Sequence, residues 1–429
     1  MAEALGAAAV GILGRRLLVG RDTRASGLEL QNGLVAGITS AGGQALLADI
    51  VPTPAVAFLV CDYEADGGVV ISASHNPAEY NGIKFFNARG YKLTDAQEDR
   101  FEEALQAMPA LDQSVINAVD RLDQTTLADA DERYITHAVH TLTSQNIDLA
   151  GIKVVVDCAH GAAFYTTPEA LRRLNAEVIV INGDFNGSDI NDDCGSTHID
   201  QLIAAVLAHR ADIGIAHDGD ADRMLAVDAS GHEIDGDFIK AICAADLKSR
   251  GRLANDTVVS TKMANQGFIE AMEALQITVI RTEVGDSKVL SAMLEGGYNL
   301  GGEQSGHIIF HDYTTTGDGL ISALQLLAVM QRTHRPLHQL AQIMQVKPQV
   351  LRNVKVANLE KVVESERLAV ELVAVGSELG SSGYIYTRAS GTEPVYRIMV
   401  QASSLEVAES YALKIEKLVL GIGDAQTGI

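Results

Sequence analysis

Short apolar runs that end in small or polar residues recur along this chain and predict an α/β protein. Three of them are expected to be strands, each followed by a turn and then by a segment with helical periodicity. These strand and helix pairs are expected at 17–20 and 28–41, at 153–157 and 167–175, and at 257–260 and 267–275. Because the same order occurs three times, we expect three similar α/β domains.

The remaining apolar runs complete the expected elements. Further strands are expected at 45–50, 67–71, 83–86, 177–181, 212–216, 224–227 and 383–387, and further helices at 1–13, 95–108, 317–332 and 404–418. A length of 429 residues agrees with several domains rather than one core. The expected domains are 1–126, 127–235, 236–348 and 349–429.

The composition is that of an ordinary globular protein with a large acidic excess. Hydrophobic residues make up 47% of the chain, and no run of about 18 apolar residues predicts a membrane span. The net charge of −23, from 33 basic and 56 acidic residues, argues against nucleic acid and anionic membranes as partners. The cysteines form no C-x-x-C pair, and residues 1–13 lack the basic start of a signal peptide. Both features favour a cytoplasmic protein with reduced thiols.

The stretch ISASHNPAEYNGIKFF, residues 71–86, carries the first candidate chemistry. A proline ends the strand before it, and an Asn-Gly pair turns the chain back into the next strand. The loop and the returning strand present a hydroxyl, Ser74, an imidazole, His75, and an amine, Lys84, at one end of a sheet. This set suits nucleophilic catalysis with a nearby proton carrier. A loop that is rich in Ser and Asn only to form turns is the equally weighted alternative.

Three carboxylates form the second candidate site. Asp218, Asp220 and Asp222 alternate along a loop that we expect to be extended, so their side chains can converge on one side. Such carboxylates repel one another unless a cation lies between them, and an all-oxygen ligand set indicates Mg²⁺, one ion per chain. An EF-hand is excluded, because Arg223 and Ala229 stand where that loop needs Gly and Glu. A solvated acidic turn is the remaining alternative.

Two further loops carry residues suited to a sugar phosphate. Arg388, Ser390, Thr392 and Arg397 form a candidate anion cradle, in which arginines bind phosphate oxygens and Gly391 permits close approach. A turn with a surface arginine is the alternative.

In the other loop, glycines surround Glu303 and Ser305, and the carboxylate can accept hydrogen bonds from sugar hydroxyls. An exposed glutamate in a glycine turn is the alternative. His307, in the same loop, is as consistent with a structural role as with a functional one.

Together, these stretches resemble the motifs of the α-D-phosphohexomutases, in that family's order. The matching stretches are Ser72-Ala-Ser-His-Asn-Pro77 with Asn81-Gly-Ile-Lys84, Asp218-Gly-Asp-Ala-Asp-Arg223, Gly302-Glu-Gln-Ser-Gly-His307, and Arg388-Ala-Ser-Gly-Thr-Glu-Pro394 with Arg397. The likeness runs from about residue 15 to residue 402. The Glu-Gln-Ser form of the third motif is more similar to the bacterial phosphoglucosamine mutases than to the phosphomannomutases.

The resemblance implies both an architecture and a reaction. The architecture is three similar mixed-sheet α/β domains plus a smaller C-terminal α+β domain around a central cleft, with one motif loop from each domain. Phosphorylated Ser74 would convert glucosamine 6-phosphate and glucosamine 1-phosphate into one another through glucosamine 1,6-bisphosphate. The product would feed UDP-N-acetylglucosamine and peptidoglycan precursor synthesis. An oxygen of phosphorylated Ser74 would complete the Mg²⁺ ligands Asp218, Asp220 and Asp222.

The same resemblance suggests roles for other residues. His75 and Lys84 are the candidate proton carriers, and we expect the apolar strand around Lys84 to depress its pKa. A simple ion pair of Lys84 with the phosphoserine is the equally weighted alternative. Arg24 is a further cation of these motifs. The residues expected to bind substrate are Arg21, Arg223, Glu303, Ser305, Arg388, Ser390, Gly391, Thr392 and Arg397. An activating serine kinase and a monomeric or homodimeric state are further expectations.

The chain departs from the family pattern in three places. The usual FGTDGIRG strand and loop does not precede Arg15, so the sequence either begins late or has a first domain without that edge element. Ser287 and Lys288 stand where the family has Arg-Tyr, which makes Lys288 the candidate substitute for a substrate-side arginine, and Ala389 replaces a proline. The alternative functions are the same chemistry on mannose or glucose phosphates, a metal-dependent phosphatase, and a non-catalytic sugar-phosphate binder.

Overall fold

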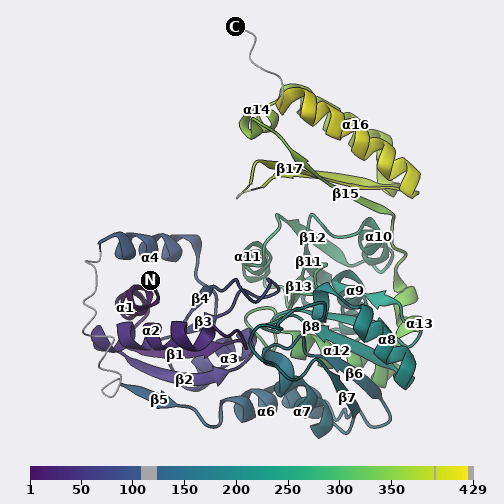
Figure 1. The fold of residues 1–429 in the computed structure, drawn as a ribbon. Helices are drawn as coiled ribbons and strands as arrows, with labels where there is room; N and C mark the ends of the chain where they lie inside the picture. Colours follow the sequence, from purple (N-terminus) through teal and green to yellow (C-terminus); the bar gives the residue numbers. More distant parts are fainter. Residues whose placement is uncertain (108–122, 391–392, 424–429) are drawn as a thin grey trace.

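The computed structural model describes residues 1–107, 123–390 and 393–423, and these residues form four sheets in sequence order. Figure 1 shows the first α/β unit in purple on the left, the second and third in teal and green on the right, and the C-terminal unit above them. Within the described ranges, none of the helices is both long and apolar enough to cross a bilayer.

The three α/β sheets repeat one topology. In each sheet the first strand lies between parallel second and third strands, and the fourth strand runs antiparallel beside the third. In that order the strands are β1 (Arg16–Arg21), β2 (Gln44–Ile50), β3 (Gly67–Ile71) and β4 (Ile83–Asn87), then β6 (Lys153–Asp157), β7 (Glu177–Ile181), β8 (Ile213–His217) and β9 (Met224–Asp228), then β11 (Thr257–Thr261), β12 (Thr278–Thr282), β13 (Leu300–Gly302) and β14 (Ile308–Phe310). Two short strands, β5 (Gln124–Thr126) and β10 (Glu233–Ile234), extend the first and second sheets. The prediction of three similar mixed-sheet domains is confirmed.

Helices connect and cover these strands. The first unit has α1 (Ala2–Ile12), α2 (Gly27–Ser40), α3 (Thr53–Asp62) and α4 (Asp95–Ala107), the second has α6 (Ala130–Thr143), α7 (Thr166–Arg173) and α8 (Asp200–His209), and the third has α9 (Gly236–Ser249), α10 (Gln266–Ala274), α11 (Asp286–Gly296), α12 (Gly319–Thr333) and α13 (Leu337–Leu340). The expected helices are present, but α3, α6, α8, α9, α11 and α13 were not predicted. Most residues of α3 are buried, so this helix carries no amphipathic period that would reveal it.

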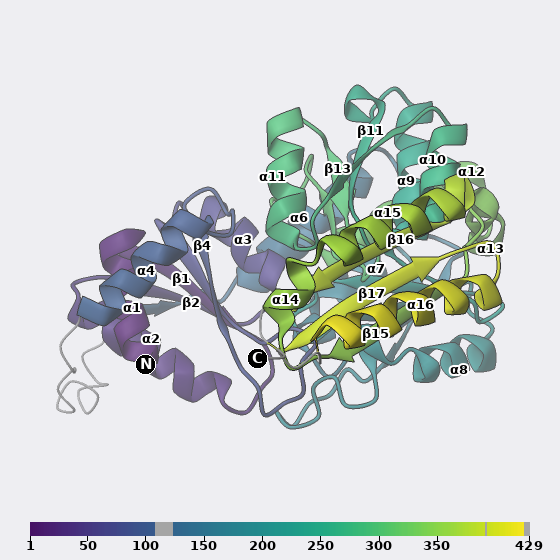
Figure 2. The same ribbon diagram turned by 90° about the horizontal axis from the view of Figure 1, so that it is seen from above.

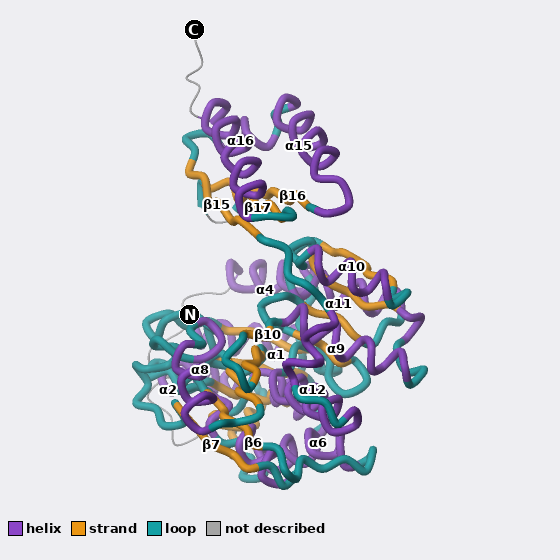
Figure 3. The backbone as a smooth tube through the Cα atoms, turned by 90° about the vertical axis from the view of Figure 1, so that its right-hand side faces the viewer, coloured by secondary structure: helices purple, strands orange, loops and turns teal. Residues whose placement is uncertain are grey.

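The C-terminal unit is an α+β domain, as expected. Its antiparallel sheet has β17 (Val395–Gln401) between β15 (Gln349–Lys355) and β16 (Tyr384–Ala389), and its helices are α14 (Leu359–Val363), α15 (Glu366–Leu379) and α16 (Leu405–Gly423). Figures 2 and 3 show α15 and α16 together on one face of this sheet, on the side away from the third unit.

One hydrophobic core runs through the first three units. Leu18, Val154 and Val258 are fully buried members of the same cluster, although they come from three different sheets. Helix α12 is buried from Gly319 to Met330 and packs against α6 and α9. The shared core therefore holds the loops of these three units in a common frame.

The C-terminal domain has a separate hydrophobic core, and hydrogen bonds join it to the third domain. Gln401 Nε2 donates to the Ala264 carbonyl oxygen over 3.3 Å, and the Gln266 backbone N–H donates to Gln401 Oε1 over 2.6 Å. Polar contacts of this kind are typical of interfaces between separately folding domains.

A fully buried ion pair lies beneath the loop that follows β13. The side chains of Lys240 and Asp237 are both 0% exposed, with 3.0 Å between Lys240 Nζ and Asp237 Oδ1. Lys240 Nζ also donates to Ser260 Oγ over 2.5 Å and to the Gly302 carbonyl oxygen over 3.0 Å. The lysine thus ties α9, β11 and β13 together at the residue before Glu303.

Replacing Lys240 with methionine is expected to lower the free energy of unfolding of the third domain by about 3 to 5 kcal/mol, because Asp237 would remain charged, buried and unpaired. As a control, Lys153→Met removes a lysine from an exposed pair with Glu177 and is expected to cost at most about 1 kcal/mol. Native-state hydrogen exchange of the β11 amides measures the difference. Equal protection in the two variants would contradict the expectation.

Candidate active site

Ser74 lies in the loop between β3 and β4, and its hydroxyl points toward the second domain. Ser74 Oγ donates to Asp218 Oδ2 over 2.6 Å and lies 3.3 Å from His75 Nδ1. Its backbone φ of 53° is in the left-handed region, which costs a non-glycine residue about 1 to 3 kcal/mol unless its surroundings hold it there. A strained serine at this position indicates a functional site.

Buried Arg24 holds the Ser74 loop in that conformation. Its guanidinium donates to four backbone carbonyl oxygens of the loop, those of Ser74, Asn76, Pro77 and Tyr80. The Asp22 carboxylate, 2.9 Å from Arg24 Nε, supplies the compensating charge, and both side chains are 0% exposed. Asn191 of the second domain donates to the Ser74 carbonyl oxygen over 2.9 Å. The side-chain donors of Arg24 are therefore used by the loop itself.

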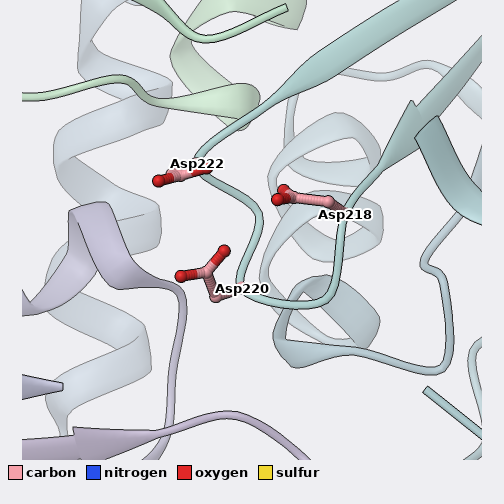
Figure 4. A group of neighbouring side chains, drawn as sticks. All are labelled: Asp218, Asp220 and Asp222. Atoms are coloured by element: carbon pink, nitrogen blue, oxygen red, sulfur yellow. The ribbon is translucent and has the colours of Figure 1, made fainter. Parts of the chain in front are cut away.

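The three aspartates come from the single loop between β8 and β9 (Figure 4), and their ligand oxygens lie within 4.8 Å of one another. The loop is a turn with Ala221 at a φ of 56°, so the expectation of an extended loop is wrong, although the carboxylates do converge. Gly219 lets this turn pass against the Ser74 loop. A Cβ at this position would lie 2.8 Å from the Ser74 carbonyl oxygen.

Crowding and burial shift the pKa values in this cluster. Burial, and then repulsion by Asp222 and Asp220, raises the pKa of Asp218 to about 7. Burial acts in the same direction on Asp222, but His307 and Lys84 hold the pKa of this carboxyl well below its usual range. Lys84 Nζ donates to Asp220 Oδ2 over 2.6 Å and lies 3.9 Å from Asp222 Oδ2. The cluster therefore depends on cations close to it.

Two carboxylate oxygens of the cluster have no hydrogen-bond partner in the part of the chain that the structure describes and are available to such a cation. Asp220 Oδ1 and Asp222 Oδ1 are buried and find no hydrogen-bond donor among the described residues. A buried carboxylate oxygen without a partner is costly, and oxygens are the ligands that hard divalent ions prefer. Asp218, Asp220 and Asp222 could therefore bind a metal, and the residues present fit one.

The two candidate proton carriers differ in charge. Burial lowers the pKa of Lys84, but the Asp220 and Asp222 carboxylates outweigh it and raise the pKa above its usual value, so the expected depression is wrong. Burial and the Arg223 charge lower the pKa of His75. Lys84 is thus held as an ammonium ion paired with aspartates, and His75 as a neutral imidazole beside Ser74.

Two arginines that are predicted to bind substrate have a buried Nε without a hydrogen-bond acceptor among the described residues. Arg223 Nε is 3.9 Å from both Asp218 Oδ2 and Asp222 Oδ1, and it is buried with no hydrogen-bond acceptor among the described residues. Arg21 Nε is also buried and also has no hydrogen-bond acceptor among the described residues. Both arginines therefore keep a donor for an anion.

The loop between β13 and β14 carries Glu303 and Ser305. Glu303 Oε1 accepts from the Gly285 backbone N–H over 3.1 Å, which ties this loop to the segment before α11, and Ser305 is exposed. His307 is 3% exposed, and its Nε2 accepts from the Gly317 backbone N–H. Its Nδ1 therefore carries the proton, and it lies 3.5 Å from Asp222 Oδ2. His307 thus contacts the aspartate cluster directly.

The predicted phosphate clamp lies apart from the aspartates. Arg388 and Arg397 are paired across β16 and β17 and line a pocket of about 160 Å³ in the C-terminal domain. Within the described ranges, no hydrogen bond or ion pair joins these arginines to Ser74 or the aspartates. The Ser390 backbone N–H donates to the Val395 carbonyl oxygen. Gly391 and Thr392 lie outside the described residues.

Comparison with known proteins identifies the family. Models of the four phosphoglucomutase/phosphomannomutase domains, the alpha/beta/alpha domains I, II and III and the C-terminal domain, match residues 1–110, 132–231, 235–346 and 351–418. The chain therefore belongs to the phosphoglucomutase/phosphomannomutase family.

Within that family, several curated relatives that cover most of the chain are phosphoglucosamine mutases. The one from Thermobifida fusca is 49% identical over 411 residues, covering 95% of this chain and 90% of its own. The one from Clavibacter michiganensis subsp. michiganensis is 48% identical, covering 98% of this chain and 94% of its own. The resemblance to phosphohexomutases, and among them to phosphoglucosamine mutases, is confirmed.

Solved structures share the fold. A phosphoglucomutase/phosphomannomutase family protein from Burkholderia thailandensis aligns with a TM-score of 0.79 at 24% identity, covering 97% of this chain and 93% of its own. The Aspergillus fumigatus N-acetylphosphoglucosamine mutase, in complex with GlcNAc-6P and magnesium, aligns with a TM-score of 0.69 at 19% identity, covering 86% of this chain and 92% of its own.

Arg24→Lys is expected to lower kcat by about 10- to 100-fold with little change in KM, because a lysine cannot hold four carbonyl oxygens and a loop displaced by about 1 Å misaligns Ser74. Arg133→Lys, at an exposed ion pair with Asp62, is the matched control and should leave kcat unchanged. Steady-state kinetics on both variants, with thermal melting to confirm folding, test the role. A folded Arg24→Lys protein with normal kcat would refute it.

Proposed function

We propose that this chain is a mutase that interconverts glucosamine 6-phosphate and glucosamine 1-phosphate. The observation that carries the proposal is the Ser74 hydroxyl, 2.6 Å from the carboxylate of Asp218 in a buried aspartate cluster. Curated relatives at 46 to 49% identity, all named phosphoglucosamine mutase, support the choice of substrate.

The proposed reaction consists of two phosphoryl transfers with Ser74 as the carrier. In the first, the bond between phosphorus and Ser74 Oγ breaks, and a bond forms between phosphorus and the free hydroxyl oxygen of the sugar phosphate. The proton of that hydroxyl passes through His75 to Oγ, and the product is glucosamine 1,6-bisphosphate. In the second, the other phosphoryl returns to Oγ and the proton returns to the sugar oxygen, so an isomer is released and no water is consumed.

The residues around Ser74 suit this scheme. His75 Nδ1 is 3.3 Å from Oγ, and its lowered pKa keeps the imidazole neutral and able to accept a proton. Lys84, whose pKa is raised, supplies a fixed positive charge beside the transferred group. Arg223 adds a second charge, with a buried Nε that has no acceptor among the described residues. These cations oppose the negative charge of a phosphoserine.

We assign the metal site to Asp218, Asp220 and Asp222, with an oxygen of phosphorylated Ser74 as a further ligand. Mg²⁺ is the ion that we propose, because the donors are all oxygens and because the Aspergillus fumigatus N-acetylphosphoglucosamine mutase was solved with magnesium. When bound, it would neutralise charge that develops on the transferred phosphoryl. The orphaned Asp220 Oδ1 and Asp222 Oδ1 are the atoms that support the assignment.

The other predicted residues bind the rest of the substrate in this scheme. Arg388 and Arg397, with Ser390, Gly391 and Thr392, clamp the phosphate that is not reacting, and Glu303 and Ser305 contact sugar hydroxyls. Activation by a serine kinase, a monomeric or homodimeric state, and a cytoplasmic location stay predictions. The location is consistent with the four cysteines, which are free thiols.

Substrate comparison on Ser74-phosphorylated protein with Mg²⁺ tests the function. Glucosamine 6-phosphate, mannose 1-phosphate and glucose 1-phosphate are each followed for isomer and for free phosphate. We expect a strong preference for glucosamine 6-phosphate without phosphate release, and Ser74→Ala should reduce turnover to background because the phosphoryl carrier is gone.

Each other outcome leads to a different conclusion. Preference for mannose or glucose phosphate would keep the mechanism and change the substrate. Steady phosphate release would favour a phosphatase. Binding without turnover by Ser74-phosphorylated protein would favour a sugar-phosphate binder and overturn the proposal.

Arg388→Ala is expected to raise the KM for glucosamine 6-phosphate by about 10- to 100-fold, because charge-assisted hydrogen bonds contribute about 1.5 to 3 kcal/mol. Arg352→Ala is the control, since Arg352 lines the same pocket but forms ion pairs with Glu409 and Glu416 of α16. Initial-rate kinetics distinguish the two variants. Equal KM values for Arg388→Ala and the unmodified protein would count against the clamp.

A further inference from the structure

Thr53 is the first residue of α3, is 0% exposed, and contacts the aspartate loop twice. Its Oγ1 donates to Asp220 Oδ2 over 2.6 Å, and its backbone N–H donates to the Asp220 carbonyl oxygen over 2.9 Å. We propose that Thr53 is a positioning residue that decides which carboxylate oxygen of Asp220 is offered to the metal. This inference rests on the metal-dependent function proposed above.

The hydrogen bonds to Asp220 are distributed unevenly. Asp220 Oδ2 accepts from both Thr53 Oγ1 and Lys84 Nζ, each over 2.6 Å. Asp220 Oδ1 is buried and has no hydrogen-bond partner among the described residues. Two donors on one oxygen fix the rotation of the carboxylate and leave Oδ1 available, in a cluster where one carboxylate oxygen from each of Asp218, Asp220 and Asp222 lies within 4.8 Å of the others. Groups that orient a metal ligand in this way commonly affect metal affinity or activity by about 10- to 100-fold.

The hydroxyl of Thr53 does not cap the helix to which it belongs. The N-cap of α3 is Pro52, and no side chain caps this helix end, so the Thr53 hydroxyl bonds outward to Asp220. Without it, Lys84 would be the remaining donor to Oδ2. Lysine is a long side chain with many rotamers, and it would restrain the carboxylate less well than a buried β-branched residue.

Thr53 also connects two domains at the site. It belongs to the first domain, which carries Ser74, whereas Asp220 belongs to the second. The Thr53–Asp220 contacts and the Ser74–Asp218 hydrogen bond therefore join two different segments of the first domain to the same aspartate loop. One threonine thus sets both the rotation of a ligand and the position of its loop beside the phosphoryl carrier.

The test compares Mg²⁺ binding by full-length variants, measured by calorimetry on unphosphorylated protein without sugar. Thr53→Val keeps the shape and removes the hydroxyl, and its Mg²⁺ dissociation constant is expected to rise by about 10- to 100-fold. Thr53→Ser keeps the hydroxyl and should stay within about threefold of the unmodified protein. Thr257→Val is the matched control, because Thr257 is buried in β11 and its hydroxyl bonds to the Asn255 carbonyl oxygen, in the third domain.

Kinetics at saturating and limiting Mg²⁺ provide a second readout. In Thr53→Val, the Mg²⁺ concentration for half-maximal activity should rise in parallel with the dissociation constant, with little change in the KM for glucosamine 6-phosphate. If Thr53→Val does not fold, Thr53→Ala is measured against Thr53→Ser, with the same expectation.

The outcomes separate this inference from the proposed function. If the protein without a substitution binds no Mg²⁺ either before or after phosphorylation of Ser74, the metal site and this inference are overturned together. If the unmodified protein binds Mg²⁺, and Thr53→Val binds it equally well, or loses no more affinity than Thr257→Val, the positioning role alone is refuted.

Discussion

Three carboxylates buried within 4.8 Å of one another are the constraint on which the site depends. Like charges in a water-poor environment raise each other's pKa, and the pKa of Asp218 is raised to about 7 for this reason after burial itself. The partners that offset the cost come from three domains: Lys84 and Thr53 from the first, Arg223 from the second, and His307 from the third. Placing these groups together therefore requires the three domains to pack in one arrangement, which the shared hydrophobic core provides.

The repeated topology explains how distant motifs meet. In every α/β sheet the motif loop follows the third strand and precedes the antiparallel fourth: Ser74 after β3, Asp218 after β8, and Glu303 after β13. The C-terminal domain uses a different sheet, but its motif also connects two antiparallel strands, β16 and β17. One structural position, repeated in the three α/β domains, thus carries the proposed phosphoryl carrier, metal ligands and sugar contact, and a hairpin of the C-terminal domain carries the proposed phosphate clamp.

The sequence was sufficient to predict those elements and site residues that a contiguous stretch of the chain indicates. Ser74, the aspartate triad and the strand–turn–helix repeats are visible because turn residues and apolar runs are contiguous. Arg24, Asn191 and Thr53 act through contacts that span 50 to 167 positions in the sequence, and nothing near them in the chain indicates a partner. The pKa of Lys84 was predicted in the wrong direction for the same reason, since its strand is apolar but its partners are on another domain.

The first three domains share one hydrophobic core, whereas the C-terminal domain has its own. This difference matches two requirements of a mutase reaction, fixed distances for phosphoryl transfer and a substrate that binds in two orientations. Phosphoryl transfer at Ser74 requires fixed distances to the aspartates, and the first three domains share one core that supplies them. The clamp has to hold one phosphate in the first transfer and the other in the second, so it must accept a substrate in two orientations. Arg388 and Arg397 lie in a domain with its own core, joined to the third domain through polar contacts such as Gln266 with Gln401. In the proposed mechanism, the three domains that share a core therefore carry the chemistry, and the domain with its own core carries the contact that two different substrate orientations must share.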